Sequence, residues 1–331
     1  MRCSVIIPTR AGTGGPAPRC VESLRGQLGA DDEVIVSVDG AGTDVSPAGG
    51  LRVVTGASGG PAGARNRALD IARGRIVLFL NDDVVARPGL IEAHLDAHAG
   101  RAGAGPAMVL GSAPWAVGGG DGDRVIDRLV RETSWIFFYD RMDDERPERD
   151  WGFRHAWTLN LSVPREIAGR FDGRLGHPMF DDLEWAFRAG AGGAVPVLYR
   201  PAAGVVHHHR YSASALLRRE ALLGHQAWAL RSINPACAAA TFGERFDNSE
   251  RARDAARRMI DAAPDAAGAF GGFLATADRP GDGVDIAGVF ESARVWREVA
   301  RAAGYLAAAD GRGVEDACRG AAALLTERVA A

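Results

Sequence analysis

The sequence predicts an α/β protein with a Rossmann-like, mixed and mostly parallel β-sheet flanked by helices, followed by an α-helical C-terminal subdomain. In the first third of the 331 residues, short β-branched runs alternate with stretches of helical spacing, which is the order of βαβ units. The run Ile76–Leu80 (IVLFL) is apolar throughout, as is typical of a strand buried on both faces. After Tyr211 the chain is alanine-rich with helical spacing. We therefore place a boundary near Ser212, which gives domains 1–212 and 213–331.

Local signals predict the elements of the first domain in chain order. The expected strands are Ser4–Ile7, ending at Pro8, then Val34–Val38, Leu51–Thr55 and Ile76–Leu80. Three helices are predicted, Arg19–Gln27, Gly63–Arg73 and Pro88–Ala99. The first shows helical spacing, the second is followed by a C-cap glycine at Gly74, and the third has a proline in its first turn. Glycines and a charged run predict a long loop from Gly111 to Gly152, and an apolar-rich block extends from Trp157 to His209.

Composition excludes several classes of function. The formal net charge of −3 disfavours a nucleic-acid binder. Every basic residue is arginine, which removes lysine Schiff-base and pyridoxal enzymes, Walker A loops and the lysine-dependent kinase site. The cysteines show no metal-ligand spacing, which predicts free thiols in a reducing compartment. With no run of about 18 apolar residues and no signal-peptide pattern, we expect a cytoplasmic protein, with a peripheral position on the inner face of the membrane as an alternative.

Polar residues follow apolar segments at four places: Asp39, Asn81-Asp82-Asp83, Asp181-Asp182 at the start of a predicted helix, and His207-His208-His209. Each alone has an ordinary structural explanation, as a cap, a partner of the helix dipole or an exposed loop. Together, carboxylates at the carboxyl ends of strands with an occasional imidazole suit Mg²⁺ or Mn²⁺, which commonly carry substrate phosphates. Arg65, near the start of a helix, is placed to add a second positive contact to those phosphates.

The ordered segments SVIIPTR, VSVDG, AGARNRALDIARGRIVLFLNDDV, TLNLSVPREI, FDDLEWAFRAG and VVHHH together resemble family 2 glycosyltransferases of the GT-A fold, over roughly residues 3–212. The resemblance implies an inverting, metal-dependent enzyme that moves a sugar from a nucleoside-diphosphate sugar to a hydroxyl-bearing acceptor, such as a glycan, a lipid-linked sugar or a small metabolite. Matching positions imply Asp182 as general base, Asp83 and His207 as metal ligands, and donor contacts at Pro8, Thr9, Arg10, Asp39, Arg65 and Asp82.

The sequence departs from the family pattern at three points. Asn81 replaces the first aspartate of the DxD motif, so fewer carboxylates hold the metal, and Asp181 replaces a longer glutamate. The segment after Asp39 is one residue longer than the common pattern. The adjacent histidines leave open which of His207, His208 and His209 binds the metal. We further expect secondary or acceptor contacts at Trp157, Asp181, Trp185 and His209, although a core position is the alternative for the tryptophans.

In the implied mechanism, a metal offsets the charge of the leaving diphosphate and Asp182 removes a proton from the acceptor hydroxyl. The helix start predicts that the dipole holds Asp182 ionised, and a plain N-cap is the alternative role. The loop from Gly111 to Gly152 is expected to close over the donor as a lid. The C-terminal helices would form an acceptor lobe, a homodimer contact, a membrane-surface patch or simple packing.

Two other functions stay open. A sugar-phosphate nucleotidyltransferase would use the glycine-rich segment 11–19 (AGTGGPAPR), but it gives Asp182 and the histidines no role. A non-catalytic nucleotide-sugar-binding protein would dock a partner through its C-terminal helices. The segment 54–60 (VTGASGG) is similar to the glycine turn of short-chain dehydrogenases, but position 62 is alanine and their catalytic lysine has no counterpart in a chain without lysine.

Overall fold

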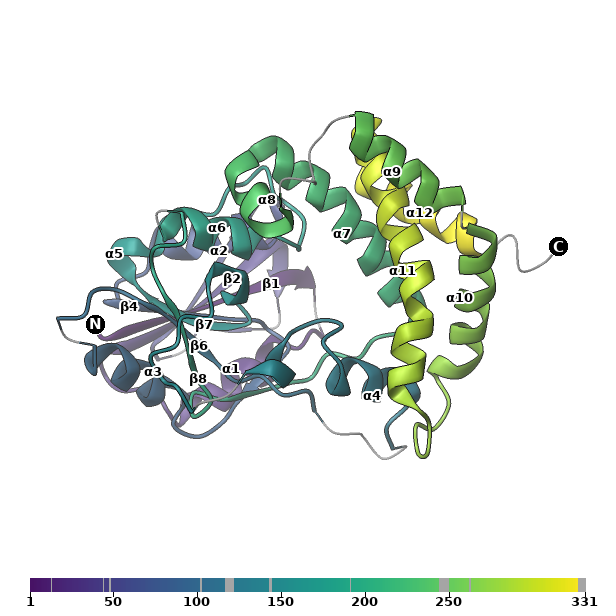
Figure 1. Ribbon diagram of the computed structural model, residues 1–331. Helices are drawn as coiled ribbons and strands as arrows, with labels where there is room; N and C mark the ends of the chain where they lie inside the picture. The colour runs from purple at the N-terminus through teal and green to yellow at the C-terminus, as the bar shows by residue number, and fades with distance from the viewer. Residues whose placement is uncertain are drawn as a thin grey trace. The chain divides into compact units, whose positions relative to one another are not determined.

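The computed structural model describes residues 1–12, 14–43, 45–47, 49–101, 103–116, 122–142, 145–190, 192–243, 250–261 and 263–326. The chain folds as two compact units, one of Met1–Ala116 with Arg141–His209 and one of Val117–Asp140 with Arg210–Ala331 (Figure 1). The second division falls close to the boundary expected near Ser212. Residues 122–140 also group with the helical unit, although they lie within the range 1–212 that the sequence assigned to the first domain.

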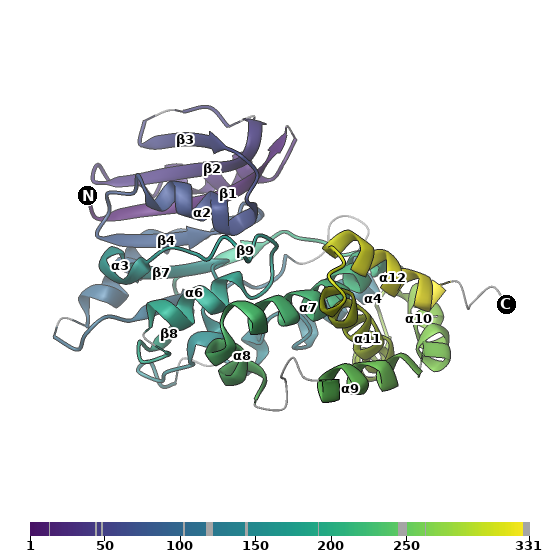
Figure 2. The ribbon, with the colours of Figure 1, turned by 90° about the horizontal axis from the view of Figure 1, so that it is seen from above.

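The first unit is built on a seven-stranded sheet with the order β3-β2-β1-β4-β7-β6-β8 (Figure 2). Strand β7 runs antiparallel to β4 and β6, and the other neighbours in the sheet run parallel. The predicted mixed, mostly parallel sheet is therefore confirmed. Its strands are β1 (Cys3–Gly12), β2 (Asp32–Thr43), β3 (Leu51–Gly56), β4 (Ile76–Leu80), β6 (Met108–Gly111), β7 (Asn160–Pro164) and β8 (Val197–Arg200), and a separate pair is formed by β5 (Val84–Ala86) and β9 (Val205–His207).

Strand β1 does not end at Pro8 as the sequence predicted. It pairs with β2 through Pro8 opposite Ser37 and continues to Gly12. Strand β4 pairs only with Cys3–Ile6 of β1, so at Pro8 the strand has a single neighbour. A proline is tolerated there because the side without a neighbour needs no backbone N–H.

Helices cover both faces of this sheet, with α2, α5 and α6 on one face and α1 and α3 on the other (Figure 1). Their bounds are α1 (Ala17–Arg25), α2 (Gly60–Leu69), α3 (Leu90–Ala99), α5 (Arg165–Ala168) and α6 (Asp181–Ala189), with short 3₁₀ turns at Tyr139–Arg141 and Phe153–His155. Beneath α6, the buried ring of Phe79 in β4 meets Phe171 and Trp185 edge-on, with centroids 5.5 and 5.3 Å away. This aromatic contact fixes α6 over the centre of the sheet.

The second unit is helical, as predicted. Its helices are α4 (Val125–Glu132), α7 (Ala213–Ile233), α8 (Pro235–Phe242), α9 (Glu250–Asp261), α10 (Ala263–Ala277), α11 (Ile286–Ala309) and α12 (Val314–Thr326). Helix α11 packs along α7 and also meets α9, α10 and α12. Across the residues that the structure describes, every helix is too short or too polar to cross a bilayer.

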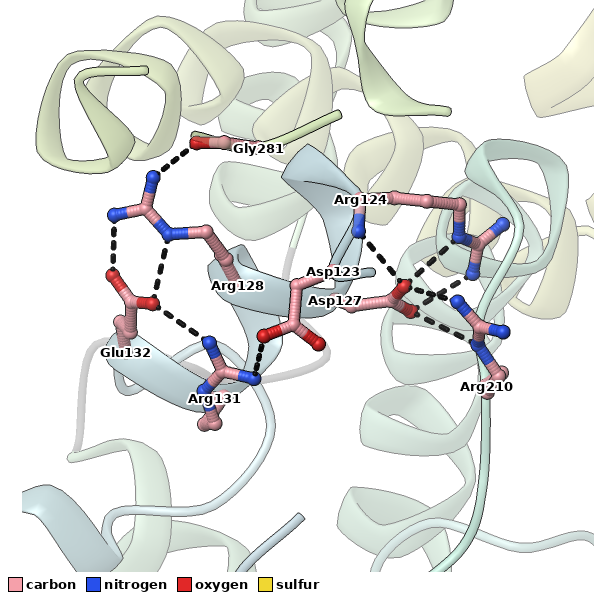
Figure 3. Close-up of polar contacts among 8 residues, drawn as sticks. All are labelled: Asp123, Arg124, Asp127, Arg128, Arg131, Glu132, Arg210 and Gly281. Atoms are coloured by element: carbon pink, nitrogen blue, oxygen red, sulfur yellow. Dashed lines mark hydrogen bonds and ion pairs between the residues drawn. The ribbon is translucent and has the colours of Figure 1, made fainter. Parts of the chain in front are cut away.

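Helix α4 lies inside the segment 111–152 that the sequence predicted as a loop. Its apolar positions are buried in the helical unit, namely Val125, Ile126, Leu129 and Val130. On its polar side, Arg128 donates to the carbonyl oxygens of Gly281 and Val284, and Asp127 binds Arg124 and Arg210 at 2.9 and 2.5 Å (Figure 3). The loop prediction is wrong for this stretch, because the surrounding glycines and charges masked a short helical repeat of apolar residues.

Candidate functional site

Asp82 and Asp83 lie in the turn that joins β4 to β5. The hydroxyl of Thr9, near the end of β1, donates to Asp82 Oδ2 at 2.6 Å. Burial and the charge of Asp83 raise the pKa of Asp82, although the hydrogen bond from Thr9 opposes them. The adjacent strands β1 and β4 thus bring two of the predicted donor contacts together at one edge of the sheet.

The pairing of β5 with β9 sets Val84 opposite His207. It thereby places His207 and His209 beside Asp83. Asp83 Oδ2 lies 3.3 Å from His207 Nε2 and 3.2 Å from His209 Nδ1. Burial by itself would raise the pKa of Asp83, but these two imidazoles outweigh it and hold that pKa well below its usual value. The ring of His208 lies against Arg19, with 3.3 Å between the nitrogens, while its backbone N–H donates to the carbonyl oxygen of Asp83 at 2.8 Å.

A divalent metal would fit the donor atoms of this cluster. Asp83 Oδ1 is buried and accepts no hydrogen bond from the residues that the structure describes. A carboxylate oxygen beside imidazole nitrogens is a donor set suited to Mn²⁺ or Mg²⁺. Among the described residues, no three His, Cys, Asp or Glu side chains are arranged to hold a metal on their own, so phosphate oxygens and water would have to complete its coordination.

Sequence reasoning did not single out Trp115, which supports His207. The two rings stack with centroids 4.2 Å apart, and an isolated bridge pairs the two backbones. A bridge between distant segments leaves no motif in the sequence, so no local signal could have indicated this contact.

Asp182 lies in the first turn of α6, directly after a strained backbone. Met179 and Phe180 have φ angles of 96° and 64°, a left-handed region that side chains other than glycine rarely adopt and that clusters at functional sites. The carboxylate of Asp182 accepts hydrogen bonds from the backbone N–H groups of Leu183 at 2.8 Å and Thr158 at 3.4 Å. These contacts hold the carboxylate against the segment that leads into β7.

The topology sets Asp182 at the same edge of the sheet as Asp82. Asn160, the first residue of β7, pairs with Leu80, the last residue of β4. Thr158, just before β7, therefore lies near the turn that carries Asp82, and Asp182 is bound to the backbone of Thr158. The structure thus gathers acids from separate sequence motifs at one end of the central strands.

Burial raises the pKa of Asp182 to about 7, with the charge of Asp181 adding to the rise and that of Arg65 opposing it. The helix start was expected to favour the ionised form of Asp182, but desolvation outweighs the backbone hydrogen bonds there and raises the pKa. A carboxylate with a pKa near 7 is well matched to removing a proton at neutral pH.

Arg65 and Asp181 form a buried ion pair with an N···O distance of 2.8 Å, and each side chain is 6% exposed. The guanidinium also lies 5.3 Å from the centre of the Phe171 ring. Arg65 was expected at the diphosphate and Asp181 at the acceptor; the structure shows that they bind one another, and both expected contacts stay predictions. A buried charge without its partner would be costly, so the pair fixes the start of α6 beside Asp182.

Asp39 caps the start of α2. Its carboxylate accepts hydrogen bonds from the backbone N–H groups of Gly59 and Gly60 at 2.7 and 3.2 Å. Arg10 pairs with Asp39 across β1 and β2 and is exposed, while Pro8 is half-buried in β1. These predicted donor contacts lie at the ends of neighbouring strands, and their role toward a donor stays a prediction.

Trp185 is a core residue and offers no face to a sugar. It is fully buried, stacks on Phe171 with centroids 4.9 Å apart and donates its indole N–H to the carbonyl oxygen of Ala168. The expected acceptor contact at Trp185 is therefore wrong, and the core alternative applies. Trp157 is half-buried, with its ring 5.3 Å from that of His155, and its predicted acceptor contact stays a prediction.

Comparison with solved structures finds distant likenesses. The crystal structure of S. aureus TarS 1-349 has a TM-score of 0.47 and 14% identity, covering 94% of this chain and 92% of that one. The same fragment in complex with UDP-GlcNAc has a TM-score of 0.45 and 13% identity, covering 94% and 93%. The structure of a mycobacterial protein has a TM-score of 0.44 and 19% identity, covering 71% and 74%. No curated protein sequence matches this chain.

The sequence model of glycosyl transferase family 2 matches residues 4–157. This range holds the ends of β1, β2 and β4, with Thr9, Asp39, Asp82 and Asp83. Asp182 and the histidines lie outside the match, and the structure alone joins them to it. The predicted resemblance is thus confirmed over residues 4–157, which match the model of glycosyl transferase family 2.

Proposed function

We propose that this chain is an inverting glycosyltransferase that uses a nucleoside-diphosphate sugar, with Asp182 as general base and a divalent metal at Asp83. The family of residues 4–157 supports the class of reaction. The observation that carries the proposal is the carboxyl of Asp182, whose pKa is raised to about 7 and which lies at the sheet edge that also carries Asp82 and Asp83. A plain N-cap would gain nothing from a raised pKa, whereas a base does.

The chain's own residues would divide the reaction as follows. Asp182 accepts the proton of the acceptor hydroxyl as the oxygen of that hydroxyl bonds to the anomeric carbon of the donor. The bond from that carbon to the diphosphate breaks in the same displacement, so the anomeric centre inverts and no covalent intermediate with the protein forms. The pair of Arg65 and Asp181 keeps Asp182 in place, because precise orientation of the reacting groups lowers the barrier.

The donor would bind at the ends of β1, β2 and β4, near Thr9, Asp39 and Asp82. Asp83, with His207 and His209 beside it, would hold the metal, which when bound supplies positive charge to the diphosphate leaving group. At Asp83 the low pKa keeps the carboxylate ionised at neutral pH, as a metal ligand must be.

A release assay tests the proposal. The protein is incubated with a panel of nucleoside-diphosphate sugars, with Mn²⁺, Mg²⁺ or a chelator, and free nucleoside diphosphate is measured. We expect metal-dependent release that Asp182→Asn lowers by a factor of about 10² to 10⁴, with donor binding retained in equilibrium dialysis. Asp172→Asn is the matched control, because Asp172 is an acid of the same unit paired with Arg174 at 2.6 Å. Undiminished turnover by Asp182→Asn would remove the base assignment.

The same assay separates the alternative functions. Release of pyrophosphate with formation of a nucleotide sugar would indicate a nucleotidyltransferase. Donor binding without release, in the presence of metal and of hydroxyl-bearing acceptors from all three expected classes, would indicate a binding protein.

A further inference from the structure

The helical unit contains a second cluster of charged side chains, in which one carboxylate faces three guanidinium groups. Glu220 of α7 is fully buried. Its two carboxylate oxygens lie 3.3, 3.7 and 2.5 Å from nitrogens of Arg219, Arg297 and Arg301. We call these four residues the Glu220 cluster.

Close packing of α7 against α11 creates the cluster. A Cβ added at Gly224 would lie 1.9 Å from the carbonyl oxygen of Arg301, and one added at Gly304 would lie 1.9 Å from that of Ala221. Because only glycine allows these backbones to come so near, Glu220 meets the arginines of α11 directly. The arrangement is therefore fixed by the backbone rather than by long, flexible side chains.

The cluster carries more positive than negative charge. Burial would raise the pKa of Glu220, but the three arginines outweigh it and lower that pKa, so the carboxylate is ionised. Within the described part of the chain, Glu220 is the only ion-pair partner of Arg219, Arg297 and Arg301. One negative charge thus stands against three positive ones, and the side chains of Arg219 and Arg297 are only 13% and 12% exposed.

Aromatic rings hold Arg297 in place. Its guanidinium lies 4.2 Å from the centre of the Trp135 ring and 5.1 Å from that of Phe290, and the indole N–H of Trp135 donates to Glu220 at 2.8 Å. The buried Nε atom of Arg297 faces Glu220 Oε1 at 3.7 Å, beyond hydrogen-bond distance, and has no hydrogen-bond partner among the described residues. A buried donor without an acceptor is unfavourable, and an incoming anion would supply one.

We propose that the Glu220 cluster binds a phosphate group through Arg219, Arg297 and Arg301. A phosphate monoester carries roughly 1.5 to 2 negative charges at neutral pH, which matches the excess positive charge of the cluster. The planar fork of an arginine suits two oxygens of one phosphate. Arg301, whose side chain is 42% exposed, gives the anion access from solvent, while Glu220 orients the guanidinium groups.

Calorimetric titration of the full chain tests this proposal, with inorganic phosphate as the probe, a chelator present and ionic strength held constant with chloride. We expect the Kd for phosphate to rise about tenfold in Arg297→Gln and in Arg301→Gln, as for the loss of one charged hydrogen bond. Arg294→Gln is the matched control on α11, because Arg294 is 67% exposed and its acidic neighbours lie 3.8 and 4.0 Å away. Its Kd should equal that of the wild type.

Two outcomes would overturn the proposal: no binding of millimolar phosphate by the wild-type chain, or an equal Kd in the wild type, Arg297→Gln and Arg301→Gln. Should Arg297→Gln fail to fold, the more exposed Arg301 still provides the test. Glu220→Gln adds a readout that a purely structural role would not move. This substitution leaves three arginines without their carboxylate. The increase in Tm on addition of phosphate should therefore be larger for Glu220→Gln than for the wild type, and an equal or smaller increase would contradict the proposal.

A second titration distinguishes the sources of the phosphate. Glycerol 3-phosphate binding at least about tenfold tighter than inorganic phosphate would assign the cluster to a phosphate carried on a larger molecule. Equal or weaker binding would assign it to free phosphate.

Discussion

Replacing Asp182 with asparagine tests the raised pKa of this carboxyl through stability as well as through activity. Asparagine has nearly the same shape but cannot ionise. In the wild type, the folded chain binds the Asp182 proton up to about pH 7, whereas the ordinary value for an aspartate is 3.8. Between these two values the folded state holds more protons than the unfolded state, so the free energy of unfolding falls as pH rises.

The size of this effect follows from the two pKa values. Each unit by which a pKa moves corresponds to about 1.36 kcal/mol. The rise from 3.8 to about 7 therefore costs the wild type up to about 4 kcal/mol at alkaline pH. Between pH 5 and pH 8, the two-state linkage relation gives a change on the order of 2 to 3 kcal/mol. The variant loses one acceptor for the backbone N–H groups, but that cost does not depend on pH.

Urea unfolding of both proteins at pH 5 and pH 8, followed by tryptophan fluorescence, measures the effect. We expect the difference in unfolding free energy to shift by roughly 2 to 3 kcal/mol in favour of Asp182→Asn as pH rises. Asp172→Asn is again the control, because Arg174 lowers the pKa of Asp172 and its contribution to stability is constant above pH 5. A difference that is the same at pH 5 and pH 8 would refute a raised pKa at Asp182.

Three further predictions follow from local contacts. Gly60→Ala sets a Cβ 1.7 Å from the carbonyl oxygen of Gly176 and should lower the free energy of unfolding by at least about 2 kcal/mol. Gly63→Ala, on the same helix, sets a Cβ 3.9 Å from Arg67 Nη1, an ordinary contact distance, and should raise the free energy of unfolding by about 1 kcal/mol; similar values for the two variants from urea titration would contradict this. Asp83→Asn should raise the Mn²⁺ concentration for half-maximal nucleoside diphosphate release at least about tenfold, and an unchanged titration would exclude Asp83 as a ligand. Burial raises the pKa of the Cys20 thiol, so a thiol reagent should label it rapidly only in urea, and equal rates in native protein would contradict its burial.

Local patterns in the sequence predicted much of the fold. The alternation of apolar strands with helical spacing predicted the sheet, because a strand buried on both faces, such as Ile76–Leu80 (β4), must be apolar throughout. The same reasoning failed at Val125–Glu132 (α4), where a short apolar repeat lies among glycines and charges. This helix packs against α10 and α11, which are distant in the chain and leave no local sign.

The sequence predicted which residues belong to the candidate site better than it predicted which of them bind one another. Asp83 lies beside His207 and also beside His209, and their role as metal ligands stays a prediction. For Arg65, the sequence predicted a contact with the diphosphate, which stays a prediction, and only the fold reveals Asp181 as its ion-pair partner. The acceptor, a homodimer and a membrane-peripheral location stay predictions.

Sequence order by itself determined the class of sheet, the helical C-terminal region and the family of residues 4–157, because periodicity and motif spacing are local properties of the chain. Tertiary structure decided what each ionisable group does. Burial and the neighbouring Asp181 raise the pKa of Asp182, and two glycines let α11 carry its arginines to Glu220. The free energy of an ionised group depends on the burial, charges and hydrogen bonds around it. In the folded protein these neighbours come from segments that are far apart in the chain.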